Sequence, residues 1–219
     1  MNSFKGFTFI DRIEEIEKNI EDKRWQSALA LSLTLPDILG GIAFPELVKR
    51  YKDGKVKMDG RNNPTRDVGA QYMKWFDEYA ADFFKANESD KWPYICGRRC
   101  YQLRCEFLHQ NKGFHNEDVT IDTHFHLGLN CGTSLCNLDD GSSDGDIFHI
   151  RIDIEQFCIR MCRAARAYYE NFHEQKEFDL YNTPVIDFLE WNLEKAEKKA
   201  EEEAKEDKKA GFFGFFKKK

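Results

Sequence analysis

The sequence predicts a mainly α-helical protein with a small antiparallel β-hairpin insertion. Apolar residues recur at helical spacing along most of the chain, whereas segments 119–129 and 148–154 alternate apolar and polar residues as strands do. The 219 residues include 19 Phe, 8 Tyr and 4 Trp, so we expect large rings to fill the core. One strong shift of composition near the C-terminus predicts a helical domain over 1–189 and a charged tail over 190–219.

Capping and helix-breaking residues define the first two predicted helices. Asp11 is expected to cap a helix near residues 11–22, because Glu14 follows at the capping-box position. The apolar run 25–35 is long enough for a buried helix, which we expect to end at Pro36 and the glycine pair a few residues beyond it.

The remaining elements follow a polar, glycine-containing loop. An aromatic face predicts an amphipathic helix over 65–85, and another apolar stripe predicts a helix over 98–110. The two alternating segments are expected to pair as a β insertion over about 118–154, with its polar turn at 139–146. A helix with apolar residues between 157 and 172 completes the domain.

The C-terminal region changes character along its length. A last helix is expected from about Pro184, with one small apolar face and almost only Glu and Lys elsewhere, so it should become solvated. Residues 211–219 contain four Phe and three Lys, a composition suited to an anionic membrane interface or a partner protein. A flexible tail is the simpler interpretation.

Charge and cysteine content limit the classes of function. A formal charge of −6 argues against broad, sequence-independent nucleic-acid binding, so any nucleic-acid site must be a local basic patch. The seven cysteines are an odd number and there is no export signal, so reduced thiols are expected. With no apolar run of the ~20 residues that a membrane span needs, we expect a soluble cytoplasmic protein.

The most informative motif places Arg104 and His109 five residues apart in an otherwise apolar helical segment. An arginine can stabilise the charge that develops on a phosphate, and a histidine can take or give a proton near neutral pH. His109 is expected in the last turn of its helix, where the helix dipole favours a partly protonated imidazole. The pair therefore predicts phosphodiester chemistry that needs neither a metal nor another cofactor.

The spacing of this pair is a difficulty for chemistry on a single helix. Five residues on an ideal helix separate two side chains by ~140° around its axis, so one helix does not direct both at one point. Two copies of Arg104 and His109, brought together at a symmetric interface, would solve this problem.

The order of motifs along the chain resembles the HEPN superfamily, whose pattern is Arg, four to six residues, then His. Trp25-x-x-Ala-Leu precedes Leu35-Pro-Asp37, a Tyr/Trp-rich helix follows, and then comes Cys100-Tyr-x-Leu-Arg-Cys-x-x-Leu-His109. The resemblance covers roughly residues 10–172 and implies a HEPN-like helical bundle.

In that family, catalytic members are metal-independent endoribonucleases with a composite site at a dimer interface. The resemblance implies that Arg104 and His109 are catalytic, that Asp37, Cys105 and Asn111 bind substrate or support the pair, and that RNA is cleaved to a 2′,3′-cyclic phosphate and a 5′-hydroxyl. It also implies a toxin or phage-defence setting, with an antitoxin or regulatory protein as partner. Many active members carry a polar residue after the arginine, where this chain has Cys105.

A catalytically inactive HEPN-like module that binds a partner protein or a nucleotide is the alternative. In that case Arg104 would pair with a carboxylate such as Glu106 or Asp37, and His109 would cap its own helix.

Metal sites are less well supported. Cys96, Cys100, Cys105 and His109 lie on one helix, which cannot wrap four ligands around a zinc ion. His124, His126 and His149 lie on the polar faces of the predicted strands, where a metal or phosphate patch competes with a merely solvated face. We therefore expect no metal.

Overall fold

The computed structural model describes residues 6–85, 89–108, 123–131, 134–135, 148–178, 183–184, 188, 192–193 and 195–200. The chain divides into two compact units. One runs from Thr8 to Tyr181, and the other combines Met1–Phe7 with Asn182–Lys219. In the smaller unit, β1 (Gly6–Phe7) pairs antiparallel with β5 (Thr183–Pro184), and the described residues from 188 to 200 are helical and exposed.

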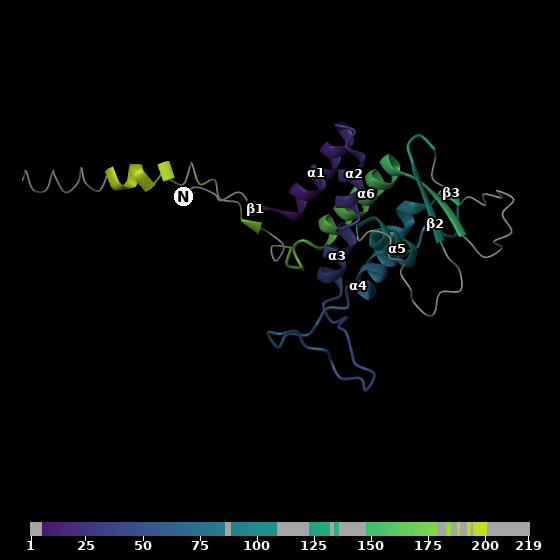
Figure 1. Ribbon diagram of the computed structural model, residues 1–219, viewed down its shortest axis with the longest axis horizontal. Coiled ribbons are helices and arrows are strands. Elements are labelled where there is room, and N and C mark those ends of the chain that lie inside the picture. Colours follow the sequence, from purple (N-terminus) through teal and green to yellow (C-terminus); the bar gives the residue numbers. More distant parts are fainter. Residues whose placement is uncertain are drawn as a thin grey trace, which may run out of the picture. The chain divides into compact units, whose positions relative to one another are not determined.

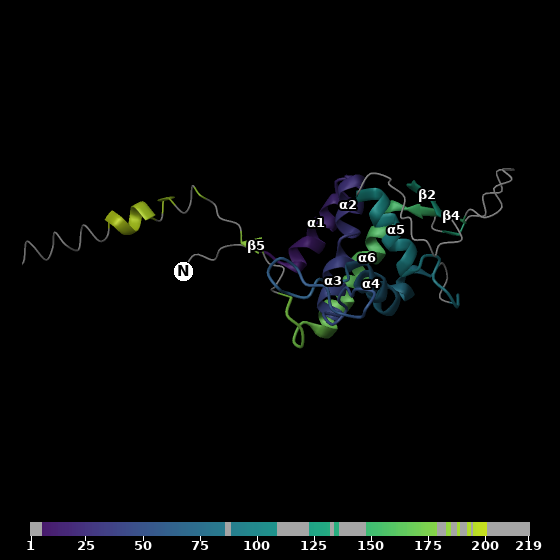
Figure 2. The same ribbon diagram turned by 60° about the horizontal axis from the view of Figure 1, so that its bottom comes forward.

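The larger unit is a bundle of helices with a small sheet at one end (Figures 1 and 2), which confirms the predicted mainly α class. Its α-helices are α1 (Phe9–Glu21), α2 (Trp25–Ser32), α3 (Leu35–Ala43), α4 (Val68–Trp75), α5 (Gly97–Leu108) and α6 (Ile154–Phe172). A π-helical turn η1 (Phe76–Ala80) and a 3₁₀ turn η2 (Ala81–Phe84) continue α4, so the helix predicted over 65–85 is three pieces.

The first helix begins earlier than the sequence predicts. Thr8, not Asp11, is its N-cap: the Thr8 hydroxyl accepts a hydrogen bond from the backbone N–H of Asp11, and the Asp11 carboxylate accepts one from the N–H of Thr8. Asp11 is therefore the acidic partner in the capping box, a position that Glu more often occupies.

The prediction that Pro36 and the glycine pair end a helix is wrong. Pro36 lies in the first turn of α3, where backbone N–H groups have no acceptor within the helix and the missing N–H of a proline costs no hydrogen bond. Gly40 and Gly41 lie inside that helix. Gly40 is needed there because a Cβ on it would lie 2.5 Å from the carbonyl oxygen of Gln71 in α4. The glycine therefore permits close helix packing.

Rings fill the core, as predicted from composition. The α4–η1–η2 run packs against α6 through ring pairs: Trp75 with Tyr168 at 5.8 Å between centroids, Tyr79 with Tyr168 at 4.8 Å, and Phe84 with Phe157 at 5.2 Å. Most of these rings are fully buried. Phe9 at the start of α1 and Phe178 beyond α6 also meet, with centroids 5.5 Å apart.

The prediction of an antiparallel hairpin is also wrong. Strand β2 (Thr123–Gly128) pairs in parallel with β4 (Phe148–Asp153), and the two-residue β3 (Ser134–Leu135) lies antiparallel on the other edge of β4. The chain between β2 and β4 is long enough for the crossover of a dozen or more residues that parallel pairing requires. The predicted turn 139–146 lies outside the described residues.

Among the described residues one segment, Trp25–Ala43, has the length and composition of a membrane span, so the prediction that no apolar run approaches that length is wrong. In the fold it breaks into α2 and α3, and half of it is buried, with Leu29 and Leu39 fully enclosed. It is consistent with the core of a soluble protein.

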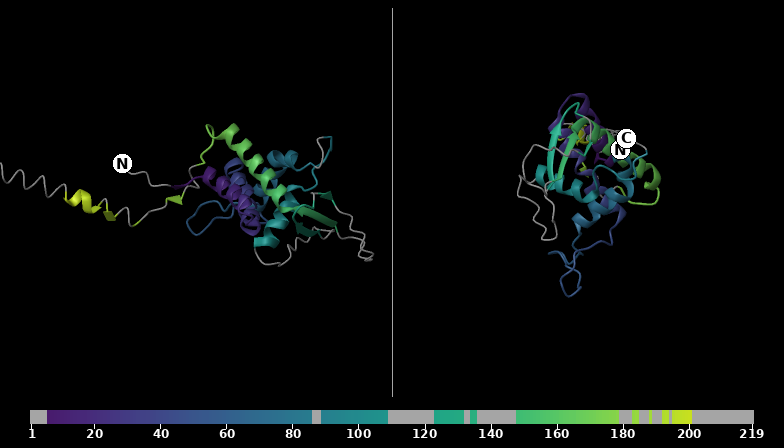
Figure 3. Two further views of the ribbon diagram at one scale, coloured as in Figure 1. Left: turned by 90° about the horizontal axis from the view of Figure 1, so that it is seen from above. Right: turned by 90° about the vertical axis from the view of Figure 1, so that its right-hand side faces the viewer.

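A long connection between α3 and α4 projects from the bundle (Figure 3, right; blue). We call residues 48–66 the arm. Its backbone forms three isolated bridges, Val48 with Arg66, Arg50 with Val56, and Met58 with Pro64, so the predicted polar loop has a defined structure.

Candidate functional site

Helix α5 carries the Arg104 motif and is anchored at its first residue. A Cβ on Gly97 would lie 2.3 Å from the carbonyl oxygen of Met73, so only glycine allows this approach to α4. The Gly97 N–H donates to the Asp77 carboxylate at 2.6 Å. Burial raises the pKa of Asp77 above its usual value, against the opposing effect of this hydrogen bond. These contacts fix where the later turns of α5 point.

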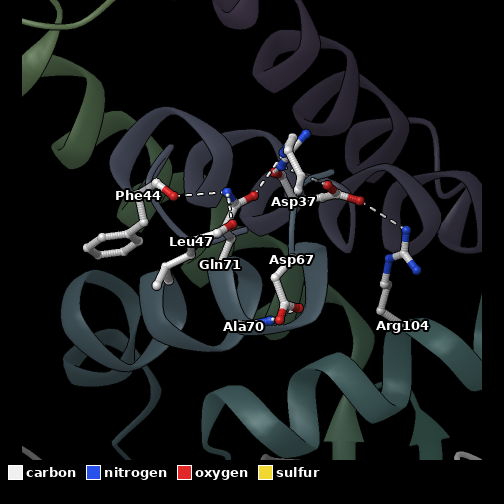
Figure 4. Close-up of polar contacts among 8 residues, drawn as sticks. Asp37, Phe44, Leu47, Asp67, Ala70, Gln71 and Arg104 are labelled. Carbon is white, nitrogen blue, oxygen red and sulfur yellow. Dashed lines mark hydrogen bonds and ion pairs between the residues drawn. The ribbon is translucent and has the colours of Figure 1, made fainter. Parts of the chain in front are cut away.

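Asp37 contacts two arginines, of which Figure 4 labels Arg104. Its Oδ2 is 3.0 Å from Nη2 of Arg104 on α5. Its Oδ1 is 3.5 Å from Nη2 of Arg66 at the end of the arm, and the same nitrogen donates to the Asp37 carbonyl oxygen at 2.8 Å. Residues from α3, α5 and the arm therefore meet at one carboxylate.

This trio has an excess of positive charge in a partly shielded place. The side chains of Arg104, Asp37 and Arg66 are 16%, 24% and 37% exposed. Burial alone would lower the pKa of Arg104, but the charge of Asp37 and a hydrogen bond with Cys105 raise it above its usual value. One carboxylate facing two guanidinium groups leaves one net positive charge, which suits an anionic ligand.

The predicted supporting residue Cys105 also lies near Arg104. Its thiol hydrogen-bonds with Tyr101 one turn earlier on α5. The pKa of Tyr101 is raised, mainly because the side chain is buried and also because of its electrostatic interaction with Cys105. The Tyr101 ring lies 5.7 Å from the Arg104 guanidinium carbon, a cation–π distance. Cys105 thus lies among the polar side chains around Arg104.

The other predicted site residues are placed as follows. Glu106, the alternative partner of Arg104, instead accepts a hydrogen bond from Gln102 at 2.7 Å. His109 directly follows Leu108, the last described residue of α5, and both His109 and Asn111 lie outside the described residues. The structure therefore brings Arg104, Asp37 and Cys105 together.

Sequence reasoning missed two residues of the cluster, Arg66 and Gln71. Fully buried Gln71 accepts a hydrogen bond from Nε of Arg66 at 2.8 Å. Its amide nitrogen donates to the carbonyl oxygens of Phe44 and Leu47 at 2.9 and 3.0 Å (Figure 4). A glutamine on the apolar face of a predicted helix was the available signal, since a buried amide requires partners.

The three strand histidines gather on the exposed face of the sheet, as predicted. Parallel pairing sets His124 beside His149, and Nε2 of His126 lies 2.9 Å from Nδ1 of His149. Asp153, at the end of β4, caps α6 by accepting a hydrogen bond from the Gln156 N–H. Within the described ranges, no three His, Cys, Asp or Glu side chains form a group that could hold a metal ion.

No model of a known protein family matches the chain, and neither the curated proteins nor the solved structures compared with it give a match. The HEPN resemblance therefore rests on the motif residues and their order along the chain.

Proposed function

We propose that the protein is a metal-independent endoribonuclease of HEPN type, with Arg104 and His109 as its catalytic pair. The observation that carries the proposal is the Arg104–Asp37–Arg66 trio, which holds an excess positive charge beside the helix that leads into His109. An arginine held in place by a carboxylate is preorganised to bind a phosphate.

In the proposed reaction, a ribose 2′-oxygen attacks the adjacent phosphorus while a His109 imidazole takes its proton. The bond from phosphorus to the 5′-oxygen breaks, and that oxygen takes a proton from the protonated imidazole (imidazolium) of the second His109, supplied by the other copy in a homodimer, which becomes neutral. Arg104 stabilises the charge on the phosphate, and Asp37 acts as its positioning residue. The products are a 2′,3′-cyclic phosphate and a 5′-hydroxyl.

The biological setting follows from the family resemblance. We propose a cytoplasmic protein that acts in a toxin or phage-defence system and is controlled by an antitoxin or regulatory protein. The tail 211–219 lies outside the described residues, and membrane contact through it is not needed for this proposal.

The test is cleavage of a mixed RNA substrate in excess EDTA. We expect wild-type protein to leave cyclic phosphate ends, and Arg104→Ala and His109→Ala each to lower the cleavage rate at least ~100-fold, as loss of an acid–base group or a charge-stabilising donor does. Asp37→Asn should cause a smaller loss. Arg98→Ala removes an exposed arginine from the same helix and is the matched control.

A binding module without catalysis is the second candidate. It is favoured by the low exposure of Arg104 and by its pairing with Asp37, since such a pair can also serve packing alone. Folded dimer that leaves RNA intact, or cleavage that survives both substitutions, would support this candidate and refute the nuclease.

A further inference from the structure

The arm carries a concentration of positive charge within an acidic chain. Residues 48–66 contain seven Lys or Arg and two Asp, a formal charge of +5, in a chain whose net charge is −6. This is the local basic patch that an acidic protein needs in order to bind a nucleic acid.

Backbone hydrogen bonds hold the arm in one shape. The N–H of Lys49 donates to the carbonyl oxygen of Thr65, that of Thr65 to Lys57, and that of Lys57 back to Lys49, each at 2.8 Å. This closed cycle joins three extended segments spaced eight residues apart. The side chains it carries are therefore presented on a preorganised support, which lowers the entropy lost on binding.

The acidic side chains of the arm bind groups of the arm itself. Asp53 forms an ion pair with Lys55 at 3.0 Å, and the Asp59 carboxylate accepts hydrogen bonds from the backbone N–H groups of Arg61 and Asn63, both at 2.8 Å. By contrast, four exposed cations make no ion pair with any residue in the described part of the chain. They are Lys49, Lys52, Lys57 and Arg61.

We propose that the arm binds the phosphate backbone of single-stranded RNA and guides it toward Arg104. The exposed ring of Tyr51, 55% accessible between Arg50 and Lys52, offers a surface on which an unpaired base can stack. The arm ends at Arg66, which contacts the same Asp37 as Arg104 does, so a strand lying along the arm reaches the candidate site. Only the choice of RNA and its path to Arg104 rest on the proposed function.

The test separates binding from cleavage by using a short single-stranded RNA whose 2′-hydroxyls are methylated, so that it cannot be cut. Fluorescence anisotropy with the full chain gives its affinity at increasing KCl. In one variant Lys49, Lys52, Lys57 and Arg61 are all changed to Gln. The control removes the same number of exposed positive charges outside the arm, and changes Lys18, Lys23, Lys74 and Lys91 to Gln.

We expect the arm variant to bind at least ~10-fold more weakly at about 50 mM KCl, and the slope of log K against log salt to become less steep by up to about 3, which is roughly 0.7 for each lost phosphate contact. The control should bind within about twofold of wild type. Circular dichroism and the melting temperature verify that both variants fold.

Equal weakening in both variants, or none in the arm variant, would overturn the proposal. Arm-dependent binding to phosphatidylserine vesicles without binding to RNA would overturn it in favour of a membrane surface. Arm-dependent RNA binding by a protein that cleaves no RNA would support this inference and refute the proposed nuclease. RNA cleavage together with RNA binding that does not depend on the arm would support the nuclease and refute this inference.

Discussion

Asp37 shows how much a single carboxylate can organise. It brings together an arginine from the arm and one from α5, and neither contact is local in sequence. The sequence motif singled out Asp37 and Arg104 as candidates, but it contained nothing to link Arg66 to them, because contacts between distant segments depend on how the helices pack. A candidate site is thus easier to predict from its motif residues than from their supporting contacts.

Gly40 provides a test of packing at the scale of one residue. Alanine in a helix interior normally gains up to about 1 kcal/mol over glycine. At Gly40, however, the added Cβ would meet the backbone of Gln71 at 2.5 Å, and overpacking typically costs 1–3 kcal/mol. We therefore expect Gly40→Ala to lower the free energy of unfolding by roughly 1–2 kcal/mol in urea denaturation.

Gly60 in the arm supplies the comparison, because nothing lies within 4 Å of a Cβ placed there. Gly60→Ala should change the free energy of unfolding by less than about 0.5 kcal/mol. Equal stability of the two alanine variants would contradict the close contact between α3 and α4 at Gly40.

At the scale of elements, the arm depends on one side chain at its base. Gln71 binds the carbonyl oxygens of Phe44 and Leu47 before the arm and the guanidinium of Arg66 at its end. Replacing it with leucine keeps the volume but leaves those buried groups without their partner, which costs ~1–3 kcal/mol for each unsatisfied group. The arm should then open more often than the bundle unfolds.

Limited proteolysis measures this opening. We expect trypsin to cut Gln71→Leu within residues 48–66 at least severalfold faster than wild type, while the circular dichroism spectrum remains helical. Gln102→Leu, at a half-buried glutamine of α5 whose amide hydrogen-bonds with Glu106 and Thr123 and not with the arm, is a control that should leave the rate unchanged. Equal cutting rates in all three proteins would mean that Gln71 does not hold the arm.

The elements themselves were predictable where local chemistry decides. Helical spacing of apolar residues located α1, α5 and α6, because burying one face requires that period whatever the helix packs against. Prediction failed at Pro36, because a proline ends a helix when it lies in the interior but is tolerated in the first turn. It also failed for β2 and β4, because alternation is the same in parallel and antiparallel strands.

At the scale of the whole molecule, buried thiols make stability depend on pH. The six cysteines within the described ranges are free, and three of them are buried. Burial raises the pKa of Cys158 and Cys162 from the ordinary 9.0 to about 12, and raises that of Cys100 further. The folded state therefore retains protons that the unfolded state releases above pH 9, so stability falls as pH rises from 9 to 12.

We expect the free energy of unfolding to be nearly constant from pH 7.5 to 8.5 and then to fall, each buried thiol contributing up to roughly 1.4 kcal/mol per pH unit. Urea denaturation at successive pH values measures the slope. Cys162→Ala should make the slope less steep by one thiol's contribution, whatever its effect on absolute stability. A slope identical to that of wild type would contradict the burial of this thiol.

The ring contact between Phe9 and Phe178 has a topological consequence. It holds the start of α1 against the chain that follows α6, so the backbone enters and leaves the larger unit at neighbouring points. Such a unit is nearly a closed loop. It can be circularly permuted with a short linker, or inserted into a surface loop of a host protein, without pulling its core apart.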